Sequence, residues 1–124
     1  MFINKNNGNK KHMSLKSSIT KIAKDVKIEG KFNFKGQVII EGTIIGKINS
    51  EDLLTISESG NVESNLKARD ADIAGNFKGD MTVTGLVRIK PTGKFIGNLT
   101  QKNGASLIIE KGGLLEGKSL VPDN

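Results

Sequence analysis

Residues 40–48 read I-E-G-T-I-I-G-K-I, and this stretch decides the fold. Branched apolar residues at positions 40, 44 and 48 frame glycines at positions 42 and 46. The same arrangement returns at 73–81, with two inserted residues at 89–99 and 109–117, and without the second glycine at 56–64. These copies form an internal repeat, and self-similarity at a nearly fixed period is the sequence signature of a stacked architecture.

The distance between the copies selects the kind of repeat. Their leading isoleucines are 16, 17, 16 and 20 residues apart, which is too short for two helices per repeat. Apolar and polar residues alternate within each copy, as in a half-buried strand, and a glycine then ends the run. About three short strands in a repeat of roughly 17 residues form one turn of a β-solenoid, called a coil below. The leading residues are expected to form a ladder inside it: Ile40, Ile56, Ile73, Ile89 and Ile109.

The repeat also predicts where the coils lie. Glycines recur every six residues from Gly30 to Gly42, and three faces of five to six residues predict a triangular coil. The strands are expected to begin at Val26, with later coils at 37–52, 53–69, 70–85, 86–104 and 105–120. The predicted fold is therefore all-β, a single-stranded parallel β-helix of about six coils. It occupies 19–120, between tails at 1–18 and 121–124.

Composition limits the class of protein. The chain has 124 residues, enough for one domain, and its 26% charged and 35% apolar residues are unlike those of a disordered chain. No apolar run approaches the ~20 residues of a spanning helix, and residues 1–25 lack the apolar segment of a secretory signal. The absence of cysteine fits a reducing cytosol and excludes disulfides, cysteine metal sites and thiol nucleophiles.

The net positive charge lies in the first fifth of the chain. Residues 1–24 carry six lysines and no acid, whereas the remaining hundred residues carry thirteen basic and thirteen acidic side chains. Residues 1–18 are therefore expected to be a disordered basic tail. This tail is either solvated and without a role, or a peripheral membrane anchor whose apolar wedge enters the acyl boundary while lysines meet anionic headgroups. The candidate membrane-contact residues, all lost if translation begins at Met13, are Met1, Phe2, Ile3, Lys5, Lys10 and Lys11.

The two ends of the solenoid predict self-association. A stack of coils ends in unpaired backbone groups above an apolar core, and such edges pair with other chains unless something covers them. Helical spacing of Leu15, Ile19, Ile22 and Ala23 predicts a short amphipathic helix over the first coil, and no such element follows the last coil. The chain is therefore expected to polymerise end to end, and pairing of like ends would give a non-polar filament. The candidate self-association residues are Ile22, Val26, Ile28, Leu107, Ile109, Leu114 and Leu115.

Other functions find less support in the residues. A catalytic histidine must be held within hydrogen-bonding distance of its substrate, and the only histidine, His12, lies in the tail. Acids lie mostly beside bases, as at Arg69–Asp70, so a solvated face is a better interpretation than a carboxylate dyad or calcium site. The chain lacks tyrosine and tryptophan as stacking platforms for nucleic acid. We expect no enzyme activity, cofactor, metal or specific nucleic-acid partner; the main alternative is a non-polymerising solenoid adaptor that binds a partner protein along one face.

Three segments resemble the bactofilins, a family of small bacterial cytoskeletal proteins. They are V-K-I-E-G-K-F at 26–32, I-I-E-G-T-I-I-G-K-I at 39–48 and V-R-I-K-P-T-G-K-F-I-G-N-L at 87–99, within a similarity over about 19–120. Some members also begin Met-Phe with a lysine soon after, as Met1, Phe2 and Lys5 do here, and in them this segment is membrane-targeting. The short 121–124 tail departs from the family and puts a C-terminal docking role in doubt.

The resemblance implies properties that periodicity does not. It implies a right-handed helix and a nucleotide-independent homopolymer, which is cytoplasmic and peripheral on the inner face of the cytoplasmic membrane. It also implies that the polymer scaffolds peptidoglycan hydrolases or synthases, or other proteins that determine cell shape.

Overall fold

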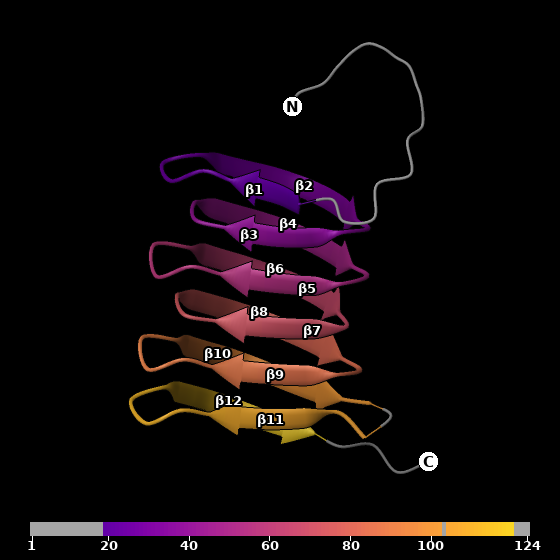
Figure 1. Cartoon of the computed structure of the whole chain (residues 1–124), viewed down its shortest axis with the longest axis vertical. Coiled ribbons are helices and arrows are strands. Elements are labelled where there is room, and N and C mark those ends of the chain that lie inside the picture. The colour runs from indigo at the N-terminus through magenta and orange to yellow at the C-terminus, as the bar shows by residue number, and fades with distance from the viewer. Residues whose placement is uncertain (1–18, 103, 121–124) are drawn as a thin grey trace.

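The computed structural model describes residues 19–102 and 104–120, which form an all-β solenoid of six coils (Figure 1). Each coil contributes a short and a long strand, and successive coils pair in parallel within two six-stranded sheets. The short strands are β1 (Ile19–Ile22), β3 (Gln37–Ile40), β5 (Leu53–Ile56), β7 (Asp70–Ile73), β9 (Leu86–Ile89) and β11 (Ser106–Ile109). The long strands are β2 (Lys27–Phe34), β4 (Thr43–Ser50), β6 (Asn61–Ala68), β8 (Asn76–Val83), β10 (Lys94–Gln101) and β12 (Leu114–Leu120). The predicted parallel β-helix is confirmed.

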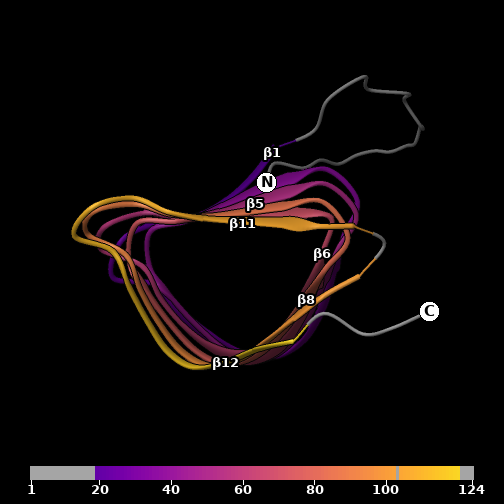
Figure 2. The same ribbon diagram turned by 90° about the horizontal axis from the view of Figure 1, so that it is seen from below.

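The helix is right-handed and triangular in cross-section. In Figure 1 the short strands run leftwards in front and the long strands return behind them as the chain descends, which is a right-handed turn. Figure 2, along the axis, shows three sides because each long strand bends in the middle. Face 1 is the outer surface of the short strands. Faces 2 and 3 are the outer surfaces of the long strands before and after the bend.

Five of the six long strands have glycine at the fourth position, where the strand bends, and β6 has Ser64 there. Gly46 has φ +136° and Gly97 has φ +137°, values that side-chain-bearing residues rarely adopt. A Cβ atom on Gly46 would also collide with the carbonyl oxygen of Gly30 in the coil above. The repeat of glycine in the sequence therefore reflects both an unusual dihedral angle and the close stacking of backbones.

Inward-facing side chains stack into apolar columns along the axis. The ladder predicted from the leading isoleucines is present, because β3, β5, β7, β9 and β11 pair in the register that aligns them. A second column joins Phe77 to Phe95, whose rings are stacked with centroids 4.9 Å apart. Core residues of the four middle coils are almost completely buried, as each has a neighbour above and below.

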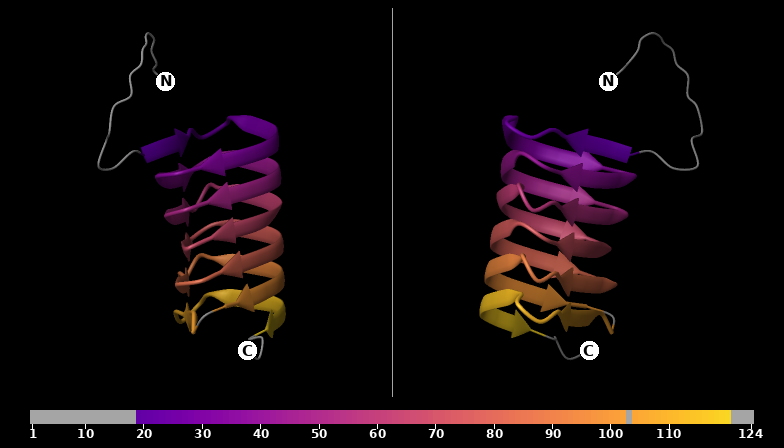
Figure 3. Two further views of the ribbon diagram at one scale, coloured as in Figure 1. Left: turned by 90° about the vertical axis from the view of Figure 1, so that its right-hand side faces the viewer. Right: turned by 60° about the vertical axis from the view of Figure 1, so that its left-hand side comes forward.

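The connection from the short strand to the long strand of a coil, called the first corner, alternates in length through the first five coils. Four-residue connections at 23–26, 57–60 and 90–93 alternate with two-residue connections at 41–42 and 74–75. The longer corners cover the shorter ones: the Ser59 hydroxyl donates to the Glu41 carbonyl at 2.8 Å, and the Thr92 hydroxyl donates to the Ala74 carbonyl at 2.7 Å. Figure 3 shows the resulting column from two sides, with the terminal coils at opposite ends.

The predicted helix over the first coil is wrong for residues 19–23. Ile19–Ile22 form strand β1, which pairs in parallel with β3, and the chain turns at Ala23 rather than continuing a helix. Pairing with β3 satisfies one edge of this strand, and β-branched residues such as isoleucine and threonine favour extended backbone. The first coil therefore starts at Ile19, earlier than the expected Val26. Leu15 lies outside the described residues.

Candidate self-association surfaces

The amino-terminal end of the solenoid exposes an apolar surface. Ile22 and Ile28 begin two of the inner columns, directly above Ile40 and Ile44, and both are only partly buried. Phe32 and Phe34 begin the two neighbouring columns; their rings lie nearly parallel, 6.0 Å apart and 4° between planes. The first coil has no described residue above it, so these side chains form an open apolar face.

The carboxyl-terminal end exposes the opposite ends of the same columns. Leu107, Ile109 and Leu115 lie in register with Val87, Ile89 and Phe95 of the coil above. Their partners are fully buried, whereas Leu107 and Leu115 are partly buried and Ile109 is 44% exposed. Both ends of the column therefore present aliphatic or aromatic side chains that no described residue covers.

Two predicted self-association residues lie elsewhere. Val26 is at a corner of the first coil rather than in a column, and it is exposed. Leu114 is in register with Lys94, so its side chain belongs to the outer surface of face 2. Sequence reasoning missed Phe32 and Phe34, although alternation in K-F-N-F after Gly30 was a signal that both face inward.

The backbone edges complete these surfaces. Strands β1 and β2 pair with strands only on their lower side, and β11 and β12 pair only on their upper side, within the described chain. Among residues 19–102 and 104–120, each end therefore leaves N–H and C=O groups unpaired around its apolar patch, and such groups can pair with another strand. Each end can therefore bond to a strand of another chain and so extend the stack of coils.

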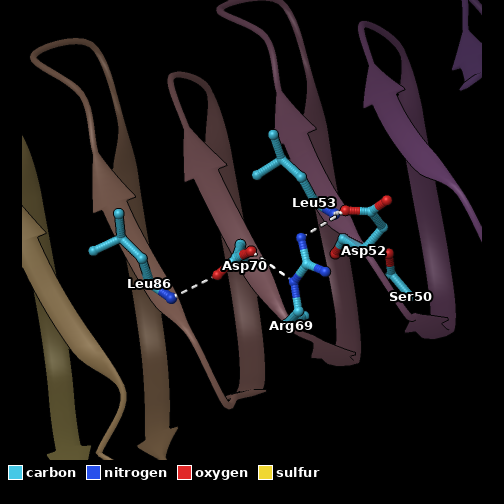
Figure 4. Close-up of polar contacts among 6 residues, drawn as sticks. All are labelled: Ser50, Asp52, Leu53, Arg69, Asp70 and Leu86. Atoms are coloured by element: carbon cyan, nitrogen blue, oxygen red, sulfur yellow. Dashed lines mark hydrogen bonds and ion pairs between the residues drawn. The ribbon is translucent and has the colours of Figure 1, made fainter. Parts of the chain in front are cut away.

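A polar network ties the middle coils together on the outside (Figure 4). Arg69, the single residue linking β6 to β7, donates from Nη2 to Asp52 and from Nε to Asp70, both at 2.8 Å. Asp70 in turn accepts the Leu86 N–H at 2.8 Å, so the contacts reach from the second coil to the fifth. The predicted pairing of Arg69 with Asp70 is confirmed, and the contact to Asp52 reflects a spacing of one coil.

This network shifts the pKa of two groups. The hydrogen bond to Asp70, together with the charges of Asp70 and Asp52, raises the pKa of Arg69. Partial burial raises the pKa of Asp70, but the hydrogen bond from the Leu86 amide and the contact with Arg69 outweigh it and lower the pKa overall. Both shifts favour the charged forms, so the pair acts as a stabilising contact at the corner.

The remaining site predictions fall partly outside the described residues. The membrane-contact candidates Met1, Phe2, Ile3, Lys5, Lys10 and Lys11 all lie there. Across 19–102 and 104–120, no group of three or more histidine, cysteine, aspartate or glutamate side chains is placed to hold a metal ion. In the same ranges, no helix is long and apolar enough to cross a membrane.

The fold places the chain in the class of parallel β-helix proteins, and comparison with known proteins identifies the family. A family model described as "Bactofilin: Polymer-forming cytoskeletal" matches residues 20–120. The chain belongs to the bactofilin family, which is a structural, cytoskeletal family.

Individual relatives agree with this assignment. Bactofilin BacO of Myxococcus xanthus is 28% identical over 80 residues, which are 64% of this chain and 64% of that protein, less than two thirds of either. Thermus thermophilus bactofilin, reconstructed by cryo-EM as double helical filaments, matches with a TM-score of 0.74 and 28% identity, covering 83% of this chain and 99% of that one. The cytoskeletal bactofilin BacA, determined by solid-state NMR, matches with a TM-score of 0.72 and 28% identity over 87% and 98% of the two chains.

Proposed function

We propose that this chain assembles end to end into filaments, using its two terminal coils as the contacts. The observation that carries the proposal is the exposure, at both ends, of core columns that are completely buried in the middle coils. Joining two ends buries these side chains and pairs the strand edges around them. The hydrogen-bonded stack of strands then continues across the joint. The double helical filaments of the Thermus thermophilus relative support assembly into filaments.

Each end pairs with its like, which makes the filament non-polar. A like-to-like contact is isologous and requires one self-complementary patch, and a mainly apolar patch meets that requirement without matching charges. The amino-terminal face carries the two stacked phenyl rings of Phe32 and Phe34, and the carboxyl-terminal face carries aliphatic side chains. Because burial of apolar surface drives both contacts, assembly needs no nucleotide.

Cysteine cross-linking tests the polarity, since the natural chain contains no cysteine. In a non-polar filament the two copies of Leu115, or of Ile28, belong to the same joint, whereas in head-to-tail stacking they are a whole protomer apart. A short bis-maleimide is therefore expected to give covalent dimers of a single Leu115→Cys or Ile28→Cys variant only in the non-polar filament. Ile96→Cys, on the outer surface of a middle coil, serves as the control and stays monomeric. Filaments in which neither terminal variant cross-links would indicate head-to-tail stacking.

The filament lies on the inner face of the cytoplasmic membrane, tethered by the tail. Met1, Phe2 and Ile3 provide an apolar wedge, and Lys5, Lys10 and Lys11 provide attraction to anionic headgroups, each worth about 1 kcal/mol near such a surface. One tail binds weakly, but many tails on one filament bind firmly through their effective concentration. On the membrane, the filament scaffolds enzymes that build or cut peptidoglycan.

Two samples examined by negative-stain electron microscopy, without nucleotide, test assembly. One is the full chain and the other begins at Ser14. Filaments in both place polymerisation in the solenoid, and discrete small particles in both, across salt and concentration, would favour a non-polymerising adaptor. Flotation of the same samples with phosphatidylglycerol vesicles in a density gradient tests the tether: the full chain is expected to rise with the vesicles and the shorter chain to remain at the bottom.

A further inference from the structure

Charge divides unequally among the three faces of the solenoid. The strand residues of face 1 carry two basic and two acidic side chains, and those of face 2 carry three of each. Face 3 carries four lysines and one aspartate, so the whole excess of positive charge in the described strands lies there. The charged residues of face 3 are Lys31, Lys47, Lys67, Asp80 and Lys118.

Face 3 also contains a like-charge pair in register. Lys31 lies directly opposite Lys47 between β2 and β4, and like charges in that position destabilise a sheet. The other two registered pairs of charged strand residues in the described chain have opposite signs, Glu63 with Lys78 on face 2 and Asp72 with Arg88 on face 1. The lysine pair is an uncompensated charge that an anionic partner would neutralise.

These lysines surround a groove of about 470 Å³ that crosses the first four coils. Lys31, Lys47 and Lys67 line it, and Phe32, Ile48 and Leu66 lie between the two outward columns of side chains. Asp80 and Thr82 line its end in the fourth coil. Three steps between coils of about 4.8 Å give a length of roughly 14 Å, which is the length of four or five extended residues.

Amide side chains line the same groove. Asn33, Asn49 and Asn65 each offer two donors and an acceptor, and none of them is hydrogen-bonded to another side chain in the described ranges. By contrast, Asn76 on face 2 donates to Asn61 at 2.9 Å, and Asn98 donates to Asp80 at 3.0 Å. The free amides are placed to bond the main chain of a peptide lying along the groove.

We propose that face 3 of the first three coils binds an extended acidic segment of a partner protein. A groove with lysines on both sides admits a chain, whereas a flat bilayer would contact only its rims. The chain's own residues 1–24 are not the occupant, because their six lysines would be repelled. The inference rests on the proposed scaffold role, for which it names the class of partner.

Fluorescence anisotropy with the full chain tests the proposal. The probe is a fluorescein-labelled octapeptide of alternating glutamate and serine, with a glutamine version as the neutral control. The variant combines Lys31→Gln, Lys47→Gln and Lys67→Gln. The matched variant combines Lys27→Gln, Lys78→Gln and Lys94→Gln, which are exposed lysines of face 2, so both lose three charges and keep the same basic tail.

We expect the full chain to bind the acidic peptide, with a Kd that rises about tenfold in the face 3 variant and less than about twofold in the face 2 variant. Equal weakening in both variants would overturn the proposal in favour of general electrostatic attraction. Loss of phosphatidylglycerol-vesicle binding by the face 3 variant, with peptide binding unchanged, would overturn it in favour of a lipid surface. Electron microscopy of the same samples shows whether they still form filaments. If filaments form but do not bind the peptide, the acidic-partner proposal is wrong and the proposed assembly is unaffected.

Discussion

The middle coils and the terminal coils use the same columns of residues with opposite consequences. Ile73 and Ile109 belong to one ladder, yet Ile73 is 0% exposed and Ile109 is 44% exposed. The difference comes from position in the stack rather than residue type, because a terminal coil lacks one neighbour. In the middle an apolar column therefore stabilises the fold, and at the end it provides a surface for association.

Truncation in the middle should have the largest effect on stability. Phe77→Ala removes a buried ring that stacks on Phe95, and we expect a loss of about 3–5 kcal/mol in the free energy of unfolding. Ile109→Ala, at the end, should cost about 1 kcal/mol because the side chain is partly exposed already. Urea denaturation followed by circular dichroism, at a concentration where the protein is dispersed, measures both; equal losses would contradict the comparison.

A smaller effect is expected at Ser64, which occupies the column of bend glycines in the third coil. Its hydroxyl is buried and has no hydrogen-bond partner among the described residues. Ser64→Ala removes this unpaired group and should raise the free energy of unfolding by about 1 kcal/mol. Ser50→Ala is the control, because the Ser50 hydroxyl donates to the Asp52 carbonyl; its loss should leave stability unchanged or slightly lower. A destabilised Ser64→Ala variant would show that the hydroxyl finds a partner in solution.

The smallest effect concerns pH and the network that joins the middle coils. The pKa of Asp70 is lower in the folded chain, so the folded state binds fewer protons and gains stability above the unfolded pKa of about 3.9. This gain disappears as pH falls through the folded pKa. The wild type should therefore lose about 0.5 kcal/mol more than Asp70→Asn between pH 6 and pH 3. Thermal melts of both variants across this range provide the measurement. If the melting temperatures of the wild type and Asp70→Asn fall in parallel, Asp70 does not contribute to the pH dependence of stability.

The sequence predicted the interior of the solenoid better than its ends. The isoleucine ladder and the glycine bends recur with the coil, so one period locates every middle strand. The spacing of Ile19 and Ile22 also fits a helix and predicts one over residues 19–22, whereas pairing with β3, about 18 residues away, makes this segment a strand. Similarly, contact between Asp52 and Arg69 depends on stacking of successive coils, which a local pattern does not reveal.

The groove on face 3 could not be predicted from composition. The strand lysines Lys31, Lys47 and Lys67 lie among acids along the sequence, and residues 25–124 have no net charge. Only the bend of the long strand separates Glu29 from Lys31, at Gly30, and Glu63 from Lys67, at Ser64, placing the acids on face 2 and the lysines on face 3. Charge that alternates along the chain is thereby sorted into faces by the geometry of the coil.

The length distribution of filaments in negative-stain electron microscopy tests end-to-end assembly most directly. Leu115→Glu places a charge in the terminal apolar column, and Ile96→Glu places the same charge at an exposed isoleucine on the outer surface of the preceding coil. We expect long filaments for the wild type and Ile96→Glu, and short oligomers for Leu115→Glu. Long filaments of Leu115→Glu, from protein that melts as a folded solenoid, would contradict end-to-end assembly.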